Sequence, residues 1–171
     1  DSAQAAKLLK LIGDFERISD HAVSISESAK EASGKDKAFS KKAKEELKIL
    51  MDAVKEIVTT AVVAFDTKDL QLASNVEPLE DVIDKINAEM KDRHIKRLRK
   101  GKCTIEMGFV LSDITTSLER IADHCSNLAV CLLQVNEESF ETHEYLENLK
   151  ESHDADYETH LKSYGEKYAL P

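Results

Sequence analysis

Apolar residues recur at spacings of three and four positions along almost the whole chain, which is the pattern of amphipathic α-helices. The same spacing predicts a first helix over about 3–32, ended by Ser33-Gly34, and a later helix over about 104–135. The clearest stretch covers about 36–65, and its apolar side consists of Ala43, Leu47, Leu50, Met51, Val54, Ile57, Val58, Ala61 and Phe65.

Two further helices are predicted with less regular patterns. The third ends at Gly101, a typical helix cap, while Pro78 allows either a start near Glu77 or a kink in a helix begun near Leu70. A more polar fifth helix is predicted over 140–168. Its narrow stripe suits docking on the same bundle or on another subunit, and consists of Leu146, Leu149, His153, Tyr157, Leu161, Tyr164 and Tyr168.

The composition supports an all-α fold. The chain of 171 residues has only 5 Gly and 2 Pro, and 33% of its residues are charged, as expected of long amphipathic helices. All predicted loops are short, so neighbouring helices should be antiparallel. We therefore expect one domain over 1–171, with an antiparallel bundle core at 1–135 and a C-terminal amphipathic helix at 140–168.

The net charge and the cysteine content bear on the ligand and on the cellular compartment of the protein. A net charge of −9 argues against nucleic acid as the main ligand. The one basic stretch, 94–100, is interpreted as the solvated C-terminal turn of a helix. Three cysteines form no disulfide framework, which favours a reducing, cytoplasmic setting. No uninterrupted apolar run, such as the one at 61–65, is long enough to span a membrane, so the chain itself is expected to be soluble.

One short motif occurs twice. The sequence Glu-Arg-Ile-x-Asp-His stands at 16–21 and again at 119–124, with an offset of 103 residues. Five identities in six positions, both within predicted helices, indicate a structural repeat of about one hundred residues. The helix at 3–32 would then lack part of its own repeat, so we expect an apolar face on it that favours dimerisation or contact with other segments.

The acidic residues of the motif share one face of their helix. At 100° per residue, Glu119 and Asp123 lie about 40° apart, opposite the apolar residues. Two carboxylates one turn apart repel each other unless a cation lies between them, and carboxylate oxygens suit hard or borderline metal ions. Either pair alone could equally be an ordinary solvated face. The duplication favours a cation site.

The stretches 14–22 and 118–124 resemble the signature helices of the PhoU family. The resemblance implies two three-helix repeats and a role in bacterial phosphate uptake and its signalling. It also implies multinuclear iron or other metal clusters bound by Glu/Asp-x-x-x-Asp motifs. The matching residues are Glu16, Asp20, Glu119 and Asp123, together with Glu80 and Asp84 on the preceding helix, for which ordinary exposed charges are the alternative.

A second resemblance covers nearly the whole chain. The run from 93–101 through 127–130, followed by a polar helix ending at 166–171, is similar to the C-terminal cytoplasmic part of bacterial sodium/phosphate cotransporter-family proteins. It implies a complete second three-helix repeat and a first repeat represented only by its last helix. The expected partners are the membrane transporter segment of the same parent protein and further copies of this chain, at the cytoplasmic side of the cell membrane.

Three functions compete at this point. The first is a regulatory domain of a sodium-dependent phosphate transporter, without enzyme activity. The second is a free-standing PhoU-type adaptor that binds a phosphate ABC transporter or a sensor kinase. The third is a di-metal carboxylate enzyme, which needs inward-facing Glu-x-x-His pairs. Neither Glu16 nor Glu119 has a histidine three positions later, so this class is disfavoured.

Overall fold

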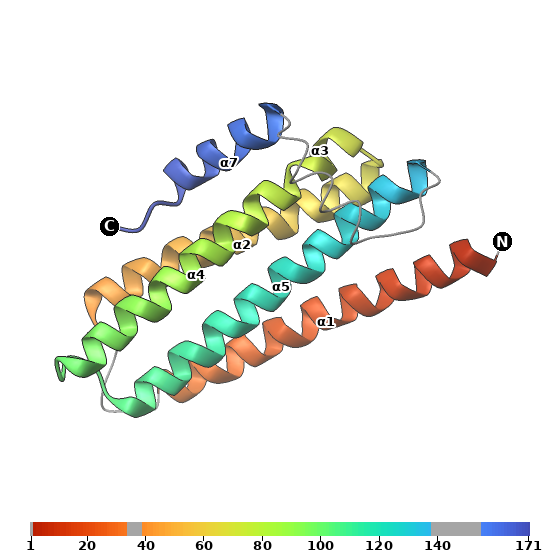
Figure 1. Ribbon diagram of the computed structural model, residues 1–171. Helices are drawn as coiled ribbons and strands as arrows, with labels where there is room; N and C mark the ends of the chain where they lie inside the picture. The colour runs from red at the N-terminus through yellow and green to blue at the C-terminus, as the bar shows by residue number, and fades with distance from the viewer. Residues whose placement is uncertain (1, 34–38, 138–154) are drawn as a thin grey trace.

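The computed structural model describes residues 2–33, 39–137 and 155–171, and the regular structure in these ranges is entirely helical. The predicted all-α antiparallel bundle is confirmed. The helices labelled in Figure 1 are α1 (Ser2–Ser33), α2 (Lys41–Thr67), α3 (Leu70–Ser74), α4 (Val76–Arg99), α5 (Ile105–Glu137) and α7 (Ala155–Lys167). The first half of the predicted C-terminal helix, with Leu146, Leu149 and His153, lies outside the described residues.

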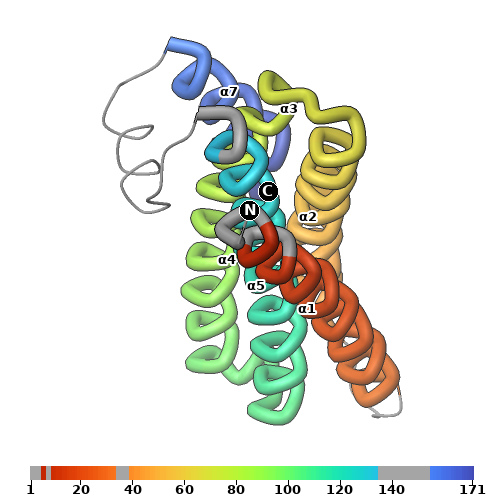
Figure 2. The backbone as a smooth tube through the Cα atoms, turned by 90° about the vertical axis from the view of Figure 1, so that its right-hand side faces the viewer, coloured from red at the N-terminus to blue at the C-terminus, as the bar shows by residue number. Residues whose placement is uncertain are grey.

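Three long helices, α2, α4 and α5, form the centre of the molecule (Figure 1). Chain direction reverses from α2 to α4 and again from α4 to α5. The helix α1 packs chiefly on α5, antiparallel to it, and Figure 2 shows it crossing the outer side of the bundle. The last helix, α7, packs on α4, as the predicted docking stripe requires. None of the helices in the described ranges is long and apolar enough to cross a lipid bilayer.

The ends of the helices follow local sequence signals. Ser40 caps α2, and its hydroxyl accepts a hydrogen bond from the Ala43 N–H. The Asp69 carboxylate caps α3 in the same way by accepting from the Leu72 N–H. Pro78 is the third residue of α4, so the start near Glu77 was right and the kinked alternative was wrong. Gly101 follows α4 with φ = 65°, a conformation that glycine adopts without strain.

Aliphatic side chains from α2, α4 and α5 fill one continuous core. Leu50, Ile57, Leu79 and Ile83 are completely buried, and Tyr168, just after α7, joins the same cluster. Cys125 and Cys131 on α5 are both buried and pack in the bundle, and burial raises the pKa of Cys125 to about 12. On α1, Leu9, Ile12 and Val23 are exposed, which agrees with the predicted apolar face.

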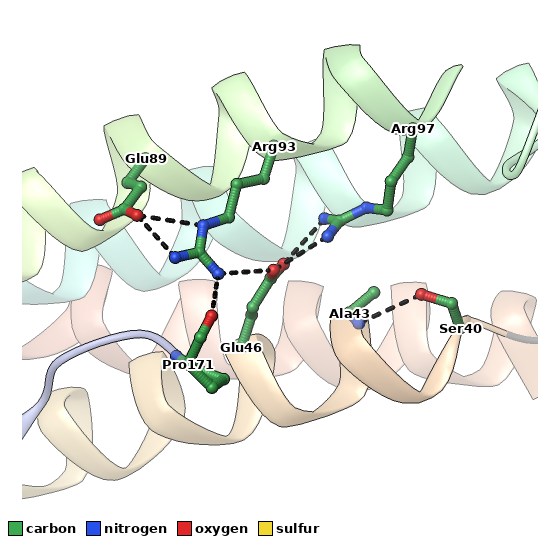
Figure 3. A network of polar contacts seen from close by, with 7 residues as sticks. All are labelled: Ser40, Ala43, Glu46, Glu89, Arg93, Arg97 and Pro171. Atoms are coloured by element: carbon green, nitrogen blue, oxygen red, sulfur yellow. Dashed lines mark hydrogen bonds and ion pairs between the residues drawn. The ribbon is translucent and has the colours of Figure 1, made fainter. Parts of the chain in front are cut away.

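A buried ion network joins α2 to α4 near one end of the bundle (Figure 3). The Glu46 side chain is only 2% exposed and lies between two arginines, with Arg93 Nη1 3.2 Å from Oε1 and Arg97 Nη2 2.8 Å from Oε2. Arg93 also pairs with Glu89 at 2.7 Å and donates to the carbonyl oxygen of Pro171 at 2.6 Å. The end of the described chain is thereby attached to α4.

Candidate metal centre

A row of carboxylates runs along the first half of α4. Glu77, Glu80, Asp81 and Asp84 are spaced by three, one and three positions, which keeps them on one side of the helix. Glu77 lies in the first turn, where a negative charge is favoured by the helix dipole. Glu77 and Glu80 are buried, Asp81 is half-buried and Asp84 is exposed, so the row leads from the interior to the surface.

Asp123 of α5 completes a group with two of these residues. Each of Glu80, Asp84 and Asp123 offers a carboxylate oxygen within 4.8 Å of the others. Two oxygens bound to one metal ion are separated by at most twice the bond length, or roughly 5 Å. Three predicted ligands from two helices therefore converge at a distance that suits one cation.

The electrostatic environment of Asp123 also favours a bound cation. Burial raises the pKa of Asp123, and the neighbouring Glu119 adds to this, while Arg120 and His124 act in the opposite direction. The Asp123 side chain is 38% exposed, and Arg120 reaches it only at 3.5 Å. A group whose ionised form is penalised by burial and by like charge gains most from a bound cation.

A second acidic group overlaps the first at Glu80. Oxygens of Glu77, Glu80 and Asp81 also lie within 4.8 Å of one another. The Ser126 hydroxyl donates to Glu77 at 2.6 Å, and the Tyr157 hydroxyl of α7 donates to Asp81. Burial and this bond raise the pKa of Tyr157. We call Glu77, Glu80, Asp81, Asp84 and Asp123 the acidic strip, which lies between α4, α5 and α7.

Glu119, the other acid of the second motif, is placed differently. Its side chain is 34% exposed and faces α4, where it accepts hydrogen bonds from the Asn87 amide and, at 3.0 Å, from the Lys91 ammonium. The expectation that Glu119 and Asp123 form one outward strip with each other is therefore corrected. Asp123 faces the acids of α4, whereas Glu119 faces an amide and a cation one turn away.

The first motif copy is not grouped in this way. Glu16 and Asp20 on α1 are exposed, and neither belongs to a group of three potential metal ligands within the described ranges. The second motif has α4 alongside it to supply further acids. The helix α1 packs chiefly on α5, whose facing residues near the motif are mostly apolar or histidine.

Equivalent histidines of the two motifs meet instead. Because α1 and α5 run antiparallel, His21 and His124 stack across the interface, with ring centroids 5.9 Å apart and an interplanar angle of 23°. The His124 Nδ1 donates to the buried Asp14 carboxylate at 2.9 Å. Burial lowers the pKa of His21, and the nearby His124 and Arg120 lower it further. These histidines join the two repeats, in line with a hydrogen-bonding role rather than metal ligation.

Three residues of the site escaped the sequence analysis. Glu77 and Asp81 could have been found from their spacing relative to Glu80 and Asp84, which predicts a common helix face. Asp14 carries no comparable signal, since its partner His124 lies 110 positions away and is fixed only by the packing of α1 on α5.

Comparison with known proteins gives three findings. The family model described as PhoU domain matches residues 47–132, a span that includes α3, α4 and most of α2 and α5. A Thermotoga maritima protein named phosphate-specific transport system accessory protein PhoU homolog 1 is 31% identical over 121 residues, 71% of this chain and 51% of that protein. A Deinococcus radiodurans protein, named phosphate-specific transport system accessory protein PhoU homolog, is 23% identical over 129 residues, 75% of this chain and 59% of its own length.

This chain thus spans little more than half the length of the two relatives it matches. No solved structure matches it. The residues matched by the family model include all five members of the acidic strip and the two half-buried arginines that pair with Glu46.

Proposed function

Because the chain belongs to the PhoU family, we propose that it is a regulatory domain of phosphate uptake that acts by contacting other proteins. The observation that carries this proposal is the family match over 47–132, which includes the residues of α4 and α5 that form the acidic strip. Both relatives carry the name of a phosphate-specific transport system accessory protein. A role in binding and regulation, without catalysis, fits a site made of carboxylates that lies at the surface of a helical bundle.

Two forms of this function differ in the partner. The names of the relatives favour an accessory protein that contacts a phosphate ABC transporter or a sensor kinase. The other form, a cytoplasmic domain attached to the membrane segment of a sodium-dependent phosphate transporter, stays a prediction from the sequence resemblance. Both forms place the domain at the cytoplasmic face of the membrane, in contact with a transporter or a sensor kinase.

The function is tested by deleting the encoding region in the native organism and measuring radiolabelled phosphate uptake. We expect wild-type cells to reduce uptake when phosphate changes from scarce to plentiful, and the deletion strain to fail to do so. Reintroducing the coding region should restore the response. Dependence of the altered uptake on external sodium would favour the sodium-coupled form, and its persistence without sodium would favour the ABC transporter form. Identical uptake in deletion and wild-type cells under both conditions would refute the proposal.

We further propose that Glu80, Asp84 and Asp123 hold a divalent or iron-type metal ion. Their fit rests on three hard oxygen donors from two helices, close enough to share one cation. When bound, the ion would offset the charge of the acidic strip and change the surface that a partner meets. Three other residues stay predicted metal ligands by the sequence resemblance alone. They are Glu119, which Lys91 contacts, and the exposed residues Glu16 and Asp20.

The metal proposal predicts a loss of Mn²⁺ affinity in Asp84→Asn/Asp123→Asn. Two of three oxygen donors lose their charge, so affinity should fall by about tenfold or more, as measured by equilibrium dialysis with elemental analysis. The matched control is Asp92→Asn/Asp113→Asn, which removes two exposed carboxylates from the same two helices. A third variant, Glu16→Gln/Asp20→Asn, reports on the first motif. Equal Mn²⁺ content in the first variant and its control would contradict the assignment.

A further inference from the structure

Basic side chains from two helices and the turn after them gather at one end of the bundle. A cavity of about 560 Å³ lies between the start of α2 and the end of α4. Seven of its ten lining residues are Lys or Arg and only one, Glu46, is acidic, in a chain whose net charge is −9. We call this the basic cavity. Its first residue on α4, Arg93, comes nine positions after Asp84, the last residue of the acidic strip on that helix.

The one carboxylate side chain of the cavity, Glu46, already forms ion pairs with arginines. Glu46 lies between Arg93 and Arg97 and forms ion pairs with both, so its single negative charge is shared by these arginines and does not neutralise the lysines (Figure 3). Lys41 has a loose contact with Glu45 at 3.9 Å. Lys42, Lys96, Lys100 and Lys102 are exposed, and among the described residues their ammonium groups form no hydrogen bond or ion pair. Four uncompensated cations therefore face one opening.

The start of α2 adds to this positive potential. Its first turn contains Lys41, Lys42 and Lys44 and no acid, although the N-terminus of a helix favours negative side chains. Lysines at this end repel one another, and an anion placed there would relieve the repulsion and meet the N–H groups of the first turn that the Ser40 cap leaves unbonded.

Two buried polar atoms nearby lack partners. A second cavity of about 330 Å³ adjoins the first and shares Ser40, Arg97 and Lys102 with it. Among the described residues, Arg97 Nε and His94 Nε2 are buried without a hydrogen-bond partner, and both side chains line this second cavity. Burial, and then the charge of Arg97, lowers the pKa of His94. Both atoms are closed off from solvent, and His94 Nε2 lies against Gly108 of α5, so the groups of the basic cavity that a ligand can reach are its exposed lysines.

From this arrangement we propose that the basic cavity binds several phosphate groups presented side by side, which Lys42, Lys96 and Lys100 hold. Charge-assisted hydrogen bonds from ammonium groups to phosphate oxygens are among the strong polar contacts of proteins. A single carboxylate would neutralise only part of the positive charge of these ammonium groups and the helix N-terminus, whereas several phosphate groups would neutralise more of it. The phosphate groups could belong to a soluble polyphosphorylated compound or to lipid headgroups on an anionic membrane. This proposal does not depend on the metal site or on the transporter partner.

The test uses tripolyphosphate as the probe and isothermal titration calorimetry as the measurement. We expect binding to the wild-type protein that weakens as salt rises. In Lys42→Gln/Lys96→Gln/Lys100→Gln the affinity should fall by about tenfold or more, because three charged donors are lost. The control with the same change in net charge is Lys10→Gln/Lys30→Gln/Lys162→Gln, which alters exposed lysines elsewhere and should bind as the wild type does.

Folding is checked separately from binding. The three substituted lysines are exposed and without described partners, so the variant should unfold at the same temperature as the wild type or slightly higher, as repulsion is relieved. Tripolyphosphate should raise the unfolding temperature of the wild type and of the control, and leave that of the cavity variant unchanged.

Vesicles and inorganic phosphate distinguish the sources of the phosphate group. Binding of tripolyphosphate without binding to phosphatidylglycerol vesicles indicates a soluble ligand. Sedimentation with phosphatidylglycerol but not phosphatidylcholine vesicles, lost in the cavity variant alone, indicates lipid headgroups. Inorganic phosphate should bind more weakly than tripolyphosphate. The proposal is overturned if the cavity variant and the control bind tripolyphosphate equally, or if the wild type binds neither tripolyphosphate nor phosphatidylglycerol.

Discussion

Replacing Arg97 by alanine is expected to lower the free energy of unfolding by about 3 kcal/mol, as is typical when one partner of a buried ion pair is removed. The Glu46 carboxylate, 2% exposed, would lose the ion pair at 2.8 Å and a second hydrogen bond from Arg97 Nη1 at 2.9 Å. Arg93 remains 3.2 Å away, but its other nitrogen atoms are engaged with Glu89. A buried carboxylate with one cation in place of two explains the loss, which urea denaturation measures.

The control for Arg97→Ala is an ion pair at the surface. Lys48→Ala removes a contact of 2.6 Å with Asp52, but both side chains are well exposed, so the change should be under about 1 kcal/mol. A double variant, Glu46→Leu/Arg97→Leu, removes the buried charge along with its partner and should lose less stability than Arg97→Ala alone. A loss below 1 kcal/mol for Arg97→Ala would show that Arg93 alone satisfies Glu46.

Truncating Ile83 in the core is expected to cost about 3–4 kcal/mol of unfolding free energy. Ile83 is 0% exposed and lies in the cluster shared by α2, α4 and α5. Ile83→Ala removes three carbon atoms and leaves a cavity that close-packed neighbours only partly fill. Ile83→Val removes one carbon and should cost about 1 kcal/mol. Urea denaturation of all variants under one condition measures both values.

The same substitution at an exposed isoleucine is the matched control. Ile105 is 71% exposed at the start of α5, so Ile105→Ala should change stability by less than about 0.5 kcal/mol. Similar losses at Ile83 and Ile105 would contradict the burial on which the bundle is built. A loss at Ile83 alone supports the packing of α4 against α2 and α5.

Local signals in the sequence predicted the helices well. Periodic apolar residues located α1, α2, α4 and α5, and Gly101 marked the end of α4 because its positive φ is a local requirement. One of the two predictions for this region was a single kinked helix begun near Leu70, which would have joined the short helix α3 to α4. In the structure α3 and α4 are separate helices. Asp69 caps the start of α3, and Pro78 lies in the first turn of α4.

The sequence predicted those parts of the candidate site that depend on residue spacing within a single helix. Glu80 and Asp84 share a face by their spacing, and the repeat singled out Asp123. Whether Asp123 or Glu119 meets the acids of α4 depends on how α5 is rotated against it, and helical periodicity does not specify that rotation. The basic stretch 94–100 was interpreted as a solvated helix end for the same reason. The lysines that begin α2 lie about fifty positions earlier, and only antiparallel packing brings them alongside.

The helix α4 carries opposite charges in its two halves, with the acidic strip near its start and Arg93, Lys96 and Arg97 near its end. From Glu80 to Arg97 a rise of 1.5 Å per residue gives a separation of about 25 Å. That distance is about three times the screening length of physiological salt, roughly 8 Å. A cation at one end and an anion at the other would thus scarcely attract each other through solvent. Coupling between the two ends would therefore have to pass through the protein itself, and among the described helices α4 is the one that carries residues of both sites.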